Sequence, residues 1–122
     1  MLRIFKCQGG ASMSPFIKKG DILIVKTDSK NLIPGDIIVF KYQDQILAHR
    51  ILFKIGKSYL VKGDTNFFPE SISKNDILGK VVIVYRAKNT KIKYLPYFNI
   101  FVLFFSFIYP FLYRVLRMFK NI

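Results

Sequence analysis

The sequence has few of the residues from which disulfide frameworks and metal centres are built. Its 122 residues include one cysteine, Cys7, and one histidine, His49. No disulfide can form within the chain, and metal sites built on paired cysteines or several histidines are excluded. Cys7 lies among strand-forming residues, which favours a small apolar side chain over a reactive thiol. We therefore expect no metal and no other cofactor.

Acidic residues are also scarce. Seven Asp and Glu stand against 20 Lys and Arg, so the net charge is +13. Such a balance predicts an anionic partner, either nucleic acid or anionic lipid. The apolar content of 52% favours the membrane. The sequence has no helix-turn-helix pattern and no basic-aromatic platform, so we expect no nucleic acid partner.

Long apolar runs are missing from the front of the chain, and the N-terminus does not read as a secretory signal. Residues 96–113, in contrast, are 18 residues without a charge. A membrane-spanning helix needs about 20 residues. We expect a membrane-associated helix over 94–120 with a single span, while an interfacial or a buried helix stays open. Basic residues flank the segment on both sides, so its orientation, and hence the membrane face of the preceding domain, is not predicted.

Residues 1–93 read as one small all-β domain with a coiled sheet. Short runs rich in β-branched residues, bounded by turn residues, predict strands. The strands are expected at 21–26, 36–42, 46–53, 59–64 and 77–86, with 46–53 and 59–64 forming a hairpin. Residues 65–76 are expected to be a loop, and residues 87–93 a basic linker into the helix.

The segment "GGASMSPFIKKGD" (9–21) surrounds Ser12 with small residues and places Pro15 close behind it. Glycines allow close backbone approach, as a nucleophilic serine requires, although an ordinary loop has the same composition. His49 is the only histidine that could take a proton from that serine. Asp64, at the end of the hairpin partner strand, is placed to orient the imidazole. A structural histidine and an ordinary Gly-Asp turn are the alternatives for the last two.

Five short motifs, in order, resemble those of signal peptidase I and its relatives. They are Ser12-Met13-Ser14-Pro15 followed by Gly20-Asp21, then "GDIIVF" (35–40), "AHRI" (48–51), "KGDTN" (62–66) and "LGKVV" (78–82). The "AHRI" motif is similar to the His-Arg motif of the endoplasmic-reticulum and archaeal branch, in which histidine replaces the base lysine.

The resemblance implies a mainly β, coiled-sheet catalytic domain and a membrane-bound serine endopeptidase. It implies Ser12 as nucleophile, His49 as general base and Asp64 as supporting acid, with the backbone amides of Ser12 and Gly10 forming the oxyanion hole. The substrates would be precursor proteins or leader peptides, cleaved after small residues near the membrane surface.

Three features depart from the family pattern. Gly10 stands where relatives often have a serine whose hydroxyl supports the oxyanion hole. Glu70 stands where His-type relatives often carry another Asp, and its role is open. The one plausible anchor follows the domain, whereas relatives usually carry it before the nucleophile.

Two other functions fit the same residues. Self-cleaving repressor peptidases share the fold, but they use lysine at the position of His49 and carry a DNA-binding domain. A basic, membrane-attached module with a decayed catalytic site is the non-enzymatic alternative.

Overall fold

The computed structural model describes residues 1–8, 13, 16–28, 31–86, 90–93 and 99–120. This part of the chain contains eight strands, one short 3-10 turn and one helix. The strands are β1 (Leu2–Lys6), β2 (Ile22–Lys26), β3 (Ile37–Tyr42), β4 (Gln45–Ile55), β5 (Ser58–Lys62), β6 (Glu70–Ser73), β7 (Ile77–Arg86) and β8 (Thr90–Lys93). The 3-10 turn is Lys74–Asp76, and the helix α1 is Asn99–Lys120.

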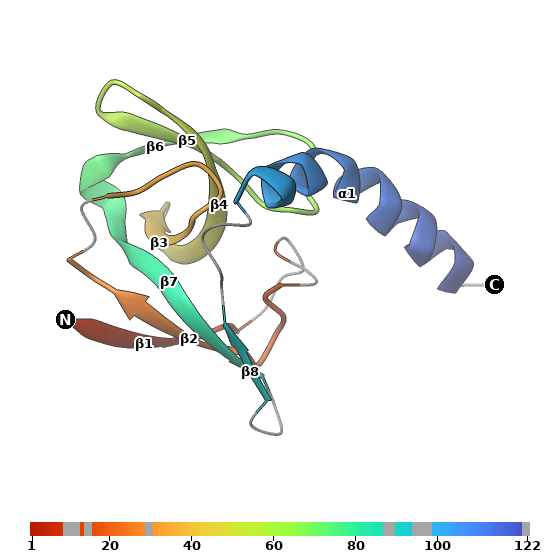
Figure 1. The fold of residues 1–122 in the computed structure, drawn as a ribbon, viewed down its shortest axis with the longest axis horizontal. Helices are drawn as coiled ribbons and strands as arrows, with labels where there is room; N and C mark the ends of the chain where they lie inside the picture. Colours follow the sequence, from red (N-terminus) through yellow and green to blue (C-terminus); the bar gives the residue numbers. More distant parts are fainter. Residues whose placement is uncertain (9–12, 14–15, 29–30, 87–89, 94–98, 121–122) are drawn as a thin grey trace.

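All eight strands belong to one antiparallel sheet. Its order is β1-β2-β7-β3-β4-β5-β6, and β8 pairs with β7. Figure 1 shows the sheet curling on itself, with α1 running outward from the end near β4 and β5. The predicted mainly β architecture followed by a C-terminal helix is confirmed.

Two tight hairpins join β4 to its neighbours in the sheet, β3 and β5. Gln43 and Asp44 join β3 to β4 with φ angles of 47° and 64°, the left-handed conformation that two-residue hairpin turns need. Gly56, with φ 58°, begins the turn from β4 to β5. The predicted hairpin of 46–53 with 59–64 is thus present, with β4 running on to Ile55 and β5 ending at Lys62.

Among the described residues, the core consists of two apolar clusters that share β3. Val39 packs with Val25 and Val81 in one cluster, while its neighbour Ile38 packs with Val61 in the other. Successive side chains of a strand point to opposite faces, so β3 is buried on both sides. This explains why residues 36–42 read as a continuous apolar run rather than an alternating one.

Two segments differ from the sequence prediction. The expected loop 65–76 contains β6, because Ile72 is buried between two outward-facing serines and the strand pairs with β5. The expected linker 87–93 contains β8, which extends the sheet beside β7. Short polar strands of this kind gain their stability from a partner strand, which the local sequence does not reveal.

The helix begins at Asn99 and ends at Lys120, within the predicted 94–120 segment. In the part of the chain that the structure describes, no helix has the length and apolar character needed to cross a membrane. The single span stays a prediction.

Candidate active site

His49 lies in the middle of β4 and is 5% exposed. It pairs with Ile38 of β3, and its ring meets the Phe40 ring edge-on with 5.6 Å between centroids. Its Nδ1 atom is in hydrogen-bond contact with Oε1 of Glu70, the first residue of β6. The imidazole is therefore held between a packed aromatic ring and a carboxylate.

The contact with Glu70 fixes the chemistry of the imidazole. When the Glu70 carboxylate is ionised it can only accept hydrogen bonds, and Nδ1 of His49 is then the nitrogen that carries the proton and donates it. In the neutral ring Nε2 is then the nitrogen with a lone pair. This is the tautomer that a general base for a serine hydroxyl needs.

Asp64 binds a different partner. Its two carboxylate oxygens accept from Nε and Nη2 of Arg50, at 3.0 and 2.9 Å, and both residues are fully buried. Nη1 of Arg50 also donates to the Gly35 carbonyl at 2.7 Å. Arg50 follows His49 directly on β4, so the two side chains point to opposite faces of the strand.

The structure therefore places Glu70, rather than Asp64, against Nδ1 of His49. The expected position of Asp64 beside the imidazole is corrected: the hairpin brings Asp64 to β4, but on the face that carries Arg50. The acid on the His49 face comes from β6, inside the segment 65–76 that the sequence predicts to be a loop. The sequence signal for this acid is the position of Glu70, where His-type relatives often carry another Asp.

Lys62, at the end of β5, is almost fully buried beside this pair. Its Nζ donates to the carbonyls of Gly63 at 3.0 Å and Asn66 at 2.9 Å. Burial lowers the pKa of the Lys62 ammonium below its ordinary 10.5, the positive charge of Arg50 adds to this, and Asp64 opposes it. Lys62 thus holds the backbone at Gly63 and Asn66, where the segment that leads to Glu70 begins.

A second arginine, Arg86, binds Phe16 and Asp21, which follow Ser12 in the sequence. Arg86 of β7 donates from Nη2 to the Phe16 carbonyl at 3.2 Å and contacts both oxygens of the buried Asp21 at 3.3 Å. Phe16 in turn lies against Arg50, with its ring centroid 5.0 Å from the guanidinium carbon. The predicted nucleophile Ser12 and the oxyanion residue Gly10 themselves lie outside the described residues.

A cleft of about 850 Å³ borders this region. Met13, the residue after Ser12, and Ala48, the residue before His49, both line it. Its other apolar walls come from β1 and the start of β4, including Phe5 and Leu47. In the described sheet β5 pairs with β4 only from Arg50 onward. The residues of β4 that line the cleft, 45–48, come before this pairing begins.

A coiled antiparallel sheet that holds a buried histidine in contact with a carboxylate has the base–acid arrangement that serine peptidases use. Residues 6–82, more than half of the chain, match the family model of Peptidase S24-like proteins, and the chain belongs to this family. No curated protein matches the chain. Membership supports a serine peptidase fold and a peptidase-type function.

Proposed function

We propose that the protein is a membrane-bound serine endopeptidase of the signal-peptidase type, with histidine as its base. One observation carries the proposal: Nδ1 of the buried His49 ring is in hydrogen-bond contact with the Glu70 carboxylate, and this contact favours the tautomer that accepts a proton at Nε2. The five ordered motifs and the match to Peptidase S24-like proteins over residues 6–82 support it.

In the proposed reaction Ser12 attacks the scissile carbonyl while Nε2 of His49 takes the hydroxyl proton. The ring becomes an imidazolium, and the carboxylate of Glu70 stabilises it through Nδ1–H. His49 then gives the proton to the leaving amine, the acyl enzyme forms, and water reverses the sequence. The backbone amides of Ser12 and Gly10 are the proposed donors to the oxyanion.

The cleft beside Met13 and Ala48 is the proposed binding site for the substrate segment. An extended peptide would lie along the start of β4, as in strand addition to a sheet, with its side chains in the apolar cleft. Following the resemblance to signal peptidases, we propose precursor proteins or leader peptides with small residues at the cleavage site as substrates.

Cleavage of a reporter preprotein by the purified full chain tests this function. Ser12→Ala should reduce the rate to background, and His49→Ala should do the same, because each removes one half of the proton transfer. Ser14→Ala is the matched control, since it removes the same hydroxyl two residues away and should keep the activity. Equal activity of the wild type and Ser12→Ala, or no cleavage by the wild type under any tested condition, would reject the assignment, and the latter would favour a non-catalytic module.

A self-cleaving regulator is the second candidate. The match to Peptidase S24-like proteins is compatible with it to the same degree as with a signal peptidase. Mass spectrometry of the full chain after incubation separates the two. Ser12-dependent cleavage of the chain itself, at a rate independent of protein concentration, would indicate the regulator; an intact chain that cleaves the reporter would indicate the endopeptidase.

A further inference from the structure

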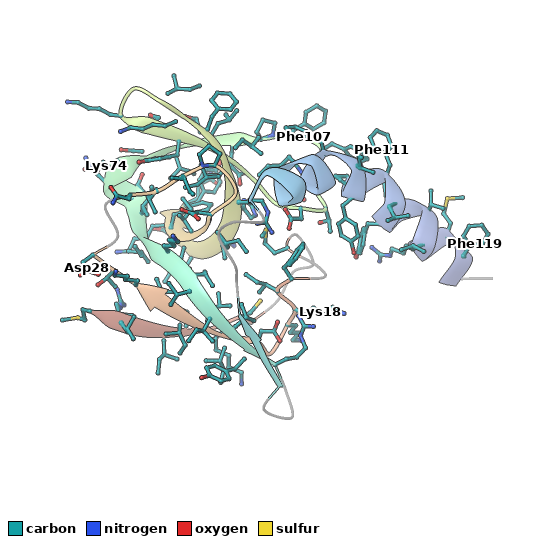
Figure 2. All side chains as sticks on the ribbon, viewed as in Figure 1. Lys18, Asp28, Lys74, Phe107, Phe111 and Phe119 are labelled. Atoms are coloured by element: carbon teal, nitrogen blue, oxygen red, sulfur yellow. The ribbon has the colours of Figure 1, made fainter. Side chains whose placement is uncertain are left out.

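Helix α1 presents a wide apolar face to the outside of the molecule. Eight of its large apolar side chains are exposed, namely Phe107, Ile108, Phe111, Leu112, Val115, Leu116, Met118 and Phe119. At about 100° per residue they occupy about half of the helix circumference. Figure 2 shows three of them, Phe107, Phe111 and Phe119, along one side of α1. We call these eight residues the apolar face.

Over residues 107–119, the part of α1 whose side chains the structure describes, the other half of the helix is polar or turned inward. It carries Arg114 and Arg117, which are exposed, together with Tyr109, which is buried, and Tyr113, which is half-buried. The division between the two halves is that of a helix lying along an apolar–water boundary with basic groups at the boundary.

The charge of the helix selects the partner. Helix α1 contains Arg114, Arg117 and Lys120 and no acidic residue. Basic residues beside an apolar helix face attract the anionic surface of a membrane, with each charge contributing to binding. A second copy of the chain would bring two molecules of charge +13 together, which mutual repulsion opposes.

We propose that α1 is an interfacial helix that binds the surface of an anionic lipid bilayer, lying in its plane with the apolar face immersed. The helix carries the β domain with it, because Phe111 stacks edge-on against Phe67 at 5.0 Å and Arg114 lies 4.4 Å from the same ring. The next residue in the chain, Phe68, is 84% exposed and enters the same boundary.

Vesicle co-sedimentation of the full chain tests the binding. The chain should bind vesicles of phosphatidylcholine with phosphatidylglycerol at least about tenfold more tightly than vesicles of phosphatidylcholine alone. Leu116→Glu should weaken binding to the anionic vesicles by roughly tenfold or more, because it places a charge in the immersed face. Ile55→Glu is the matched control, since Ile55 on β4 is 57% exposed and Leu116 is 54% exposed.

Other occupants of the apolar face give different results. Equal binding by Leu116→Glu and the wild type would overturn the proposal. So would a wild-type dimer in sedimentation velocity that Leu116→Glu converts to a monomer without a change in lipid binding. Because these readouts do not depend on cleavage, they separate a failure of this proposal from a failure of the proposed peptidase activity.

The orientation has its own test, because the chain contains no tryptophan. Single substitutions Ile108→Trp, Leu112→Trp and Phe119→Trp place the probe within about 40° of one another around the helix, and the first and last positions are about 17 Å apart along it. Quenching by brominated lipids should report one common depth for all three and a shallower depth for Tyr113→Trp on the opposite half. Depths that change steadily from 108 to 119 would show a helix crossing the bilayer and would overturn the in-plane arrangement.

Discussion

The Nδ1 atom of His49 on β4 is in contact with the carboxylate of Glu70 on β6, two strands away in the sheet. Between them β5 pairs its Val61 with Glu70 and its Lys62 with Arg50, so the sheet register brings the acid to the imidazole. If His49 is the base, its contact with the supporting carboxylate therefore depends on this register.

Glu70→Ala should reduce kcat for reporter cleavage by about 10²–10⁴, because the imidazole loses the acceptor that fixes its tautomer and stabilises its charged form. KM should change little, since Glu70 does not line the cleft. Steady-state kinetics with a circular dichroism spectrum of each variant measures this. Ser71→Ala, a neighbouring exposed position on β6, is the control; a wild-type kcat for Glu70→Ala would show that the Glu70 contact has no catalytic role.

Asp64→Asn should instead act on stability. Arg50 and Asp64 are both fully buried, and removing one partner leaves an unpaired buried charge, which costs about 3–5 kcal/mol of unfolding free energy. Urea denaturation measures the loss. Asp28→Asn, which breaks the exposed ion pair of Asp28 with the N-terminal amine, should leave the urea midpoint unchanged.

The double variant Arg50→Met with Asp64→Leu completes this experiment. Replacing both charges by apolar groups removes the unpaired charge, so it should recover most of the stability lost in Asp64→Asn. If the double variant is no more stable than Asp64→Asn, the loss does not come from an unpaired charge.

Much of the fold could be predicted from the sequence, and the site only in part. The strands around 22–26, 37–42 and 77–86 are apolar and β-branched enough to be recognised locally. β6 and β8 are short and polar, and they exist as strands because β5 and β7 offer an edge. Glu70 reaches His49 through the pairing of β6 with β5, so the local sequence, which does not indicate β6, cannot indicate this contact either.

Burial of Lys62 predicts a pH-dependent contribution to stability. Its pKa in the folded protein is lowered, chiefly by burial, whereas in the unfolded chain it is the ordinary 10.5. Between these two values the unfolded state binds more protons, so the unfolding free energy rises with pH. The difference in unfolding free energy between the wild type and Lys62→Met should therefore shift in favour of the wild type as pH rises from 7 toward the ordinary value of 10.5, and then level off.

Chemical denaturation of both proteins at a series of pH values measures that difference. Lys41→Met, an exposed lysine on β3, is the control, and its difference from the wild type should stay flat over the same range. A flat difference for Lys62→Met as well would mean that Lys62 keeps an ordinary pKa in the folded protein.

Phe67→Ala should loosen the connection between α1 and the segment that leads to Glu70. Phe67 packs edge-on against Phe111 and lies under the Arg114 guanidinium, interactions worth about 0.5–1.5 kcal/mol each. Amide hydrogen exchange should become faster in residues 63–70 and in α1 of this variant, while the strands β2, β3 and β7 stay protected. Phe68→Ala alters the neighbouring ring, which is 84% exposed, and should leave exchange in both segments unchanged. Unchanged exchange in Phe67→Ala, or equal acceleration in the two variants, would show that α1 is not held to the β domain through Phe67.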